Sequence, residues 1–179
     1  MNCMNNYWGD ILINIVASII FLIVYETFIK RLFVFFKYRG LRGYYLVCSQ
    51  GGQAFYNSPD GTPNFLKIDI SFWNPNVLMT KSKDFDQTYL KKWKTWTGKI
   101  VMNELTDDYG SGFYVYEEGA EPGLHEIFIK DKTTGTILVR VTDYGKANLR
   151  ERQDNVSALQ NWKKVDKHDK LINDLKKLV

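Results

Sequence analysis

The chain has 179 residues, room for one ordinary domain and an appendage but cramped for two independent domains. Its formal net charge of +4 is modest, and we expect no DNA or RNA polymer as a partner. Cys3 and Cys48 are the two cysteines, so the sequence holds neither a disulfide framework nor a CxxC metal motif.

Residues 11–25 form an apolar run that only Asn14 and Ser18 interrupt. Extended from Trp8 to Ile29, the run has 22 residues, more than the roughly 20 that cross a ~30 Å hydrocarbon core. Glu26 stands near the basic end, four residues before Lys30, where the two side chains can pair. The sequence therefore predicts one transmembrane helix.

Two alternatives remain for this segment. A secretion signal begins with positive charge and ends at a small-residue cleavage site, whereas residues 1–10 contain no Lys or Arg and no A-x-A pattern follows. A buried helix of a soluble domain usually has a polar face, which this run lacks. Both alternatives fit the residues less well than a membrane span.

Charge asymmetry sets the expected orientation. Asp10 precedes the run, and five basic residues follow it, with no acidic residue among them: Lys30, Arg31, Lys37, Arg39 and Arg42. Because cytoplasmic flanks collect Lys and Arg, we expect a single pass through the membrane, the N-terminus outside and the rest in the cytoplasm. Residues 28–38 are too short and basic for a second crossing, so their bases are expected to reach anionic lipid.

Beyond Arg42 the pattern alternates between apolar and polar residues, as in Leu66–Phe72. Turn residues separate most such runs, which predicts a mainly β fold: a small antiparallel barrel of about eight strands, with a two-sheet sandwich as the alternative. The predicted parts are residues 1–38 (membrane helix and basic segment), 39–145 (cytoplasmic barrel) and 146–179 (amphipathic helical tail). The strands are expected at 43–50, 53–57, 66–72, 76–81, 89–97, 99–104, 112–117, 124–130 and 136–142.

No catalytic pattern emerges from the sequence. His125 lies in a predicted strand and His168 in the charged tail, and neither belongs to a metal motif or a nucleophile elbow. No glycine-rich phosphate loop is present. We therefore expect no enzyme activity, no cofactor and no metal, with an unrecognised active site as a remaining alternative.

Aromatic side chains favour ligand binding instead. The stretch YLKKWKTWTGK (89–99) interleaves bases with Tyr89, Trp93 and Trp96, a pattern that suits stacking of nucleobases; core packing explains the same rings. Arg140 in TILVRVT faces away from its valine neighbours. Inside a barrel it would need an anion such as phosphate, and outside it would simply be solvated.

One membrane helix, a basic segment and a β-rich domain that opens on Leu41-Arg42-Gly43-Tyr44-Tyr45 form an unusual combination. It resembles the transmembrane β-barrel effectors of bacterial cyclic-nucleotide anti-phage defence, the CBASS type and related systems. The resemblance implies a barrel that binds a cyclic di- or oligonucleotide and membrane helices that assemble to disrupt the inner membrane. The better-known members have two membrane helices, whereas this chain has one.

Helix assembly requires contacts within the bilayer. Asn14, Ser18 and Glu26, spaced four and eight residues apart, are expected to lie roughly on one face and to mediate a homo-oligomer. The alternative function is a membrane-tethered, lipocalin-like binding or scaffold protein for a lipid or protein partner. The sequence leaves open whether the ligand triggers or restrains assembly.

Overall fold

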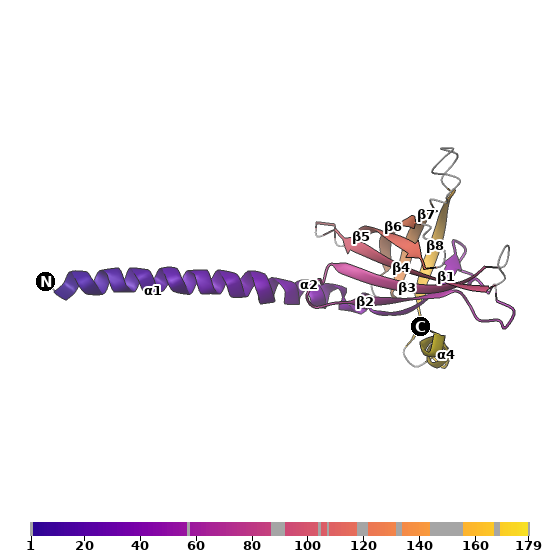
Figure 1. Cartoon of the computed structure of the whole chain (residues 1–179), viewed down its shortest axis with the longest axis horizontal. Coiled ribbons are helices and arrows are strands. Elements are labelled where there is room, and N and C mark those ends of the chain that lie inside the picture. The colour runs from indigo at the N-terminus through magenta and orange to yellow at the C-terminus, as the bar shows by residue number, and fades with distance from the viewer. Residues whose placement is uncertain are drawn as a thin grey trace.

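The computed structural model describes residues 2–56, 58–86, 92–103, 105–106, 108–117, 122–131, 134–143, 156–166 and 169–178. A long N-terminal helix projects from one end of a β-barrel (Figure 1). The helix runs through α1 (Asn2–Val24), a π-helical turn η1 (Tyr25–Ile29), α2 (Lys30–Tyr38) and a 3-10 turn η2 (Arg39–Leu41). Its continuous stretch from Tyr7 to Leu41 is long and apolar enough to cross a membrane.

In the part of α1 whose side chains the structure describes, residues 7–24, all are exposed except the half-buried Ile11. Ile13 and Ile15, about 200° apart around the helix, are 66% and 52% exposed. An exposed apolar surface of this extent marks a membrane or partner contact. The helix is therefore compatible with a membrane anchor that carries the barrel.

Eight antiparallel strands close the barrel in sequence order, β8 pairing with both β7 and β1. This confirms the predicted mainly β fold and the choice of a barrel over a sandwich. The strands are β1 (Gly43–Ser49), β2 (Phe65–Ile70), β3 (Val77–Asp86), β4 (Lys92–Met102), β5 (Tyr109–Tyr116), β6 (Pro122–Asp131), β7 (Thr136–Asp143) and β8 (Val156–Lys164).

The structure corrects the predicted boundary at residue 145. β8 belongs to the barrel although it lies within the segment predicted as a helical tail, and α4 (Leu171–Leu178) is the part of that segment that is helical. Apolar residues three apart, such as Leu159 and Trp162, imitate a helical repeat. The segment nevertheless forms a strand, because pairing with β1 and β7 removes the open edges that these two strands would otherwise have.

Two further strand predictions are wrong in detail. Residues 53–57 form no strand in the part that the structure describes; Ala54 makes one isolated bridge to Cys48. The separate strands predicted at 89–97 and 99–104 are a single strand, β4, because Gly98 continues the pairing with Thr80 and Tyr114 instead of breaking it.

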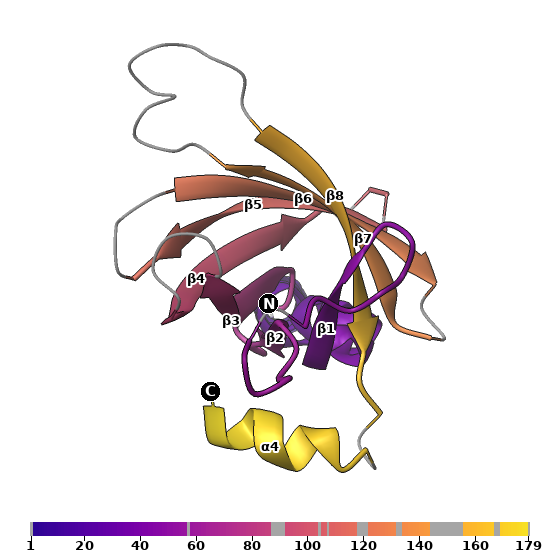
Figure 2. The ribbon, with the colours of Figure 1, turned by 90° about the vertical axis from the view of Figure 1, so that its right-hand side faces the viewer.

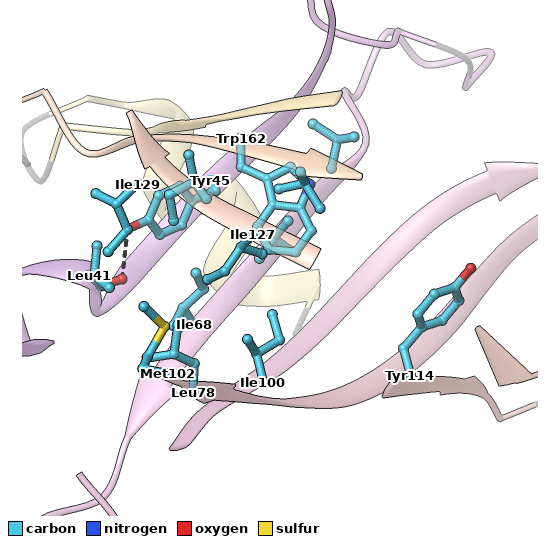
Figure 3. Close-up of a cluster of buried hydrophobic side chains, with 14 of the residues drawn as sticks. Leu41, Tyr45, Ile68, Leu78, Ile100, Met102, Tyr114, Ile127, Ile129 and Trp162 are labelled. Atoms are coloured by element: carbon cyan, nitrogen blue, oxygen red, sulfur yellow. Dashed lines mark hydrogen bonds between the residues drawn. The ribbon is translucent and has the colours of Figure 1, made fainter. Parts of the chain in front are cut away.

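The barrel interior is filled on the side that faces the helix. Large buried side chains from successive strands meet there, among them Ile68, Leu78, Ile100, Ile127 and Trp162 (Figure 3). The end of the helix closes this mouth: Tyr38 and Leu41 are buried in the same cluster, and the Tyr45 hydroxyl donates to the Leu41 carbonyl at 2.7 Å.

Outside the barrel wall, α4 covers β1 and β2 (Figure 2). Its residues Ile172 and Leu175 pack with Phe65 and Val165 in a second apolar cluster, which explains why Phe65 is buried while its neighbour Leu66 points inward. Neither the end of the helix nor α4 lies over the opposite mouth of the barrel.

Candidate ligand pocket inside the barrel

A pocket of about 270 Å³ lies in the half of the barrel remote from the helix. β1 starts next to the helix at Gly43 and runs away from it. Val47, near the far end of β1, and Phe55, in the loop that follows, both line the pocket, so the pocket lies in the remote half. Among the described residues that line the pocket, Asp84 is acidic and none is Lys or Arg. The lining comprises Val47, Phe55, Asn64, Asp84, Trp96, Tyr114, Tyr116, His125, Val141 and Gln160.

Aromatic rings enclose His125 at the base of this pocket. The imidazole stacks on Tyr114, with ring centroids 4.3 Å apart and planes at 18°. Trp96 and Trp162 meet it edge-on at 4.9 and 5.2 Å. Burial lowers the pKa of His125 from 6.5 to about 3, so the ring is neutral at physiological pH.

Two polar atoms beside the pocket have no hydrogen-bond partner among the described residues: Nδ1 of His125 and the hydroxyl of Tyr114. A third, Oγ1 of Thr80, is buried on β3. Each such atom costs about 1–3 kcal/mol when left unpaired. A neutral imidazole and a phenol can each donate or accept, so together they can recognise the polar edge of a ligand.

Asp84 fixes the position of the indole of Trp96. The Trp96 Nε1–H donates to Asp84 Oδ2 at 2.6 Å. The Ser82 hydroxyl donates to the Phe65 carbonyl at 2.7 Å and lies 3.1 Å from Asp84 Oδ1. A short hydrogen bond to a carboxylate holds the indole in one orientation. Trp96 therefore presents a preset aromatic wall to the pocket.

The predicted ligand residues separate in the structure. Trp96 lines the pocket and is 4% exposed. Trp93 lies on the other face of β4, half-buried against Phe85, with ring centroids 5.5 Å apart. Tyr89 lies outside the described residues.

Arg140 does not reach the interior. Its guanidinium pairs with Glu126 on the outer wall at 3.3 Å, and its side chain is 52% exposed. Because Ile137, Val139 and Val141 take the inward positions of β7, the odd-even alternation sends Arg140 outward. The interpretation of Arg140 as an interior anion ligand is therefore wrong.

Sequence reasoning missed His125, Tyr114 and Asp84. The position of His125 in the strand could have identified it: it lies two and four residues before Ile127 and Ile129, so all three share the face that points into the core. Asp84 continues the inward series Leu78, Thr80 and Ser82 along β3. A polar residue in phase with buried apolar ones marks an interior polar site.

On the N-terminal helix, Asn14 and Ser18 lie together. They line one shallow groove with Ile11, Ile15 and Ile19, and the Ser18 hydroxyl donates to the Asn14 carbonyl at 2.8 Å. Glu26 faces elsewhere: it pairs with Lys30 at 3.4 Å and lines a different groove beside Trp73. The expected common face is wrong for Glu26, because twelve residues at about 100° each turn the helix by roughly 120° from Asn14.

No protein-family model matches the chain, and no curated protein matches it. Among solved structures, it is similar to EF1p2_mFAP2b bound to DFHBI. The two are 11% identical, with a TM-score of 0.47, and the match covers 72% of this chain and 95% of the other.

Proposed function

We propose that this protein is a membrane-anchored receptor whose cytoplasmic barrel binds a nucleobase-bearing ligand, with a cyclic di- or oligonucleotide as the ligand class. The observation that supports the proposal is the pair of unpartnered polar atoms, His125 Nδ1 and the Tyr114 hydroxyl, set between aromatic rings. Stacking of a base on an aromatic ring contributes about 1–3 kcal/mol. The two polar atoms can bind the base edge.

Charge directs how such a ligand would enter. The described lining residues include no Lys or Arg that could bind a phosphate in the pocket, while the aromatic rings suit a neutral base. The volume of about 270 Å³ is just below the roughly 300–1,000 Å³ of sites that enclose drug-sized ligands. We therefore expect one base inside and the phosphates at the mouth.

The membrane helix supplies the output. The basic residues after Ile29 favour a cytoplasmic barrel, where the ligand would be made. The groove that contains Asn14 and Ser18 offers polar contacts between copies of the helix. A ligand that changes the oligomeric state of the barrel would control helix assembly and disruption of the inner membrane, the role of the anti-phage effectors that the chain resembles.

A lipocalin-like carrier of a lipid is the second candidate, supported by the apolar side chains that fill the helix-side half of the barrel. It explains neither the unpartnered polar atoms nor the carboxylate of Asp84 at the pocket. Both candidates need the same remote mouth. They differ in the chemistry of the ligand.

Thermal-shift measurements on the full-length protein in detergent test the proposal with a panel of cyclic dinucleotides and a long-chain fatty acid. We expect a cyclic dinucleotide to raise the melting temperature, and His125→Phe, which keeps the stacking but removes Nδ1, to weaken binding on the order of tenfold. Arg140→Gln, on the outer wall, is the control and should bind normally. A shift with the fatty acid alone would support the carrier instead.

A further inference from the structure

We propose that a basic groove between the end of the membrane helix and α4 binds the phosphate of an anionic phospholipid. The groove has a volume of about 820 Å³, within the roughly 300–1,000 Å³ of ligand sites. Four of its lining residues are cationic, and none of the described residues that line it is acidic. The lining comprises Phe35, Arg39, Gly40, Arg42, Gly43, Tyr44, Lys164, Val165, Ile172 and Lys176.

Three separate elements bring the cations together. Arg39 and Arg42 flank the last turn of the helix, Lys164 ends β8, and Lys176 comes from α4. The Lys164 ammonium donates to the Gly40 carbonyl, which places it at the helix end. The guanidinium of Arg39 lies over the Phe36 ring, 4.5 Å from its centroid.

Arg42 also pairs with a carboxylate that does not line the groove. Its Nε is 3.1 Å from Asp69 Oδ1, and Asp69 also pairs with Lys67 at 2.7 Å. A guanidinium has five N–H donors, so this single contact leaves it able to bind a phosphate oxygen as well. The groove retains a positive balance.

Helix length places the groove at the membrane surface. From Trp8 to Phe36 the helix rises about 42 Å at 1.5 Å per residue, which matches the 40–45 Å of a bilayer with its headgroups. Phe33 and Phe36 are 71% and 49% exposed, as expected of interfacial aromatics. Arg39 follows Phe36 by about 5 Å, so Trp8 and Arg39 are about 46 Å apart along the axis; a helix tilt of about 20° reduces this to roughly 44 Å, which places Arg39 at the outer edge of the headgroup layer.

The barrel rim also contacts the helix, at Phe28, about two turns before Phe36. Trp73, in the connection between β2 and β3, is 58% exposed. It contacts Phe28 with ring centroids 6.4 Å apart, and the Arg31 guanidinium lies 5.8 Å from its ring. Trp beside Arg is characteristic of the headgroup region.

The apolar floor of the groove suits a lipid rather than a free anion. Phe35, Tyr44 and Ile172 border the cations and can take the glycerol and the first acyl carbons. Binding would link α4 to the helix through the lipid. The inference is independent of the interior ligand, because the groove lies outside the barrel wall and requires only the membrane anchor.

Native mass spectrometry of the full-length protein released from detergent tests the inference with phosphatidylglycerol and phosphatidylcholine at equal concentration. We expect retained phosphatidylglycerol adducts, reduced on the order of tenfold by Arg39→Gln with Lys164→Gln. The matched control, Lys81→Gln with Lys99→Gln, removes the same charge from the barrel wall and should keep the adducts. Equal adducts in both double variants, or no preference over phosphatidylcholine, would refute the site.

Lys164 holds the Gly40 carbonyl, so the double variant could lose its fold. Lys176→Gln, an exposed change on α4, should by itself reduce the adducts about threefold with unchanged circular dichroism. Millimolar inorganic phosphate is added in a separate arm. Persistence of the lipid adduct supports a lipid site, whereas displacement by phosphate would overturn it in favour of a free-anion site.

Discussion

The imidazole of His125 lies nearly parallel to the phenol ring of Tyr114, with centroids 4.3 Å apart, although the two come from different strands. The register pairs Tyr114 with Gly123 and His125 with Gly112, so the two rings are diagonal neighbours on the inner face. Each ring faces a glycine across the strand pair. A Cβ at Gly123 would overlap the ring of Tyr114, so this glycine provides the space for that ring, whereas a Cβ at Gly112 would meet the backbone of β4 at Lys99.

The first prediction concerns pH. His125 has a pKa of about 3 in the fold and an ordinary value of 6.5 when unfolded, so the unfolded chain takes up the proton first as pH falls. The contribution of neutral His125 is complete above about pH 6.5 and is lost as pH falls from there towards 3. At pH 4.5 the loss is about 2 to 3 kcal/mol relative to pH 7.

Urea unfolding at pH 7 and pH 4.5 measures this loss, and His125→Phe is the comparison because it cannot titrate. Asp60 does not confuse the comparison. The hydrogen bond from Ser58 lowers the pKa of Asp60, so its contribution to the free energy of unfolding is lost only below about its ordinary pKa of 3.8, and this loss is the same in both proteins. The variant should lose less stability on acidification than the wild type. An equal loss in both would show that His125 titrates normally.

The second prediction concerns Trp96→Phe. This change keeps an aromatic ring but removes the Nε1–H that Asp84 accepts at 2.6 Å. A partly buried carboxylate that loses a donor costs about 1–3 kcal/mol of the free energy of unfolding. Trp93→Phe is the matched control, because that ring contacts Phe85 from the other face of β4, and it should cost less than about 1 kcal/mol. Denaturant unfolding of both variants checks the difference.

The third prediction concerns Gly123→Ala. A Cβ at this position would overlap the ring of Tyr114, so the ring must move into the pocket. Overpacking of this kind costs about 1–3 kcal/mol and should also weaken ligand binding. Gly40→Ala is the control: a Cβ there meets no heavy atom within 4 Å, and stability should change by less than about 0.5 kcal/mol. If Gly123→Ala showed the same ligand-induced rise in melting temperature as the wild type, the expected displacement of the Tyr114 ring into the pocket would be contradicted.

Local alternation was sufficient to predict the barrel. Leu66, Ile68 and Ile70 alternate with polar residues, and the structure places all three in the core. β8 could not be predicted in the same way, because Gln160 and Asn161 interrupt its apolar phase. Its conformation depends on β1 and β7, which are remote in sequence, so only the requirement to close the sheet identifies it.

The candidate site was less accessible to sequence reasoning. Aromatic content indicated binding, and Trp96 does line the pocket, but Trp93 is only three residues away on the opposite face. The face of a strand residue follows from register, and the interior is defined only when the barrel closes. The same reason explains why Arg140 had two interpretations in the sequence and has one in the structure.

The last prediction concerns the orientation of the helix in the membrane. Tyr56 is 59% exposed in the loop beyond β1, at the end of the barrel remote from the helix. If the barrel is cytoplasmic, Tyr56→Cys in a Cys3→Ser background should react with a membrane-impermeant maleimide only after the cells are permeabilised. Native Cys48 is 1% exposed and should not react in either case, so any label reports the new thiol. Labelling of Tyr56→Cys in intact cells would reverse the orientation that the basic residues after Ile29 predict, and with it the access of the pocket to a cytoplasmic ligand.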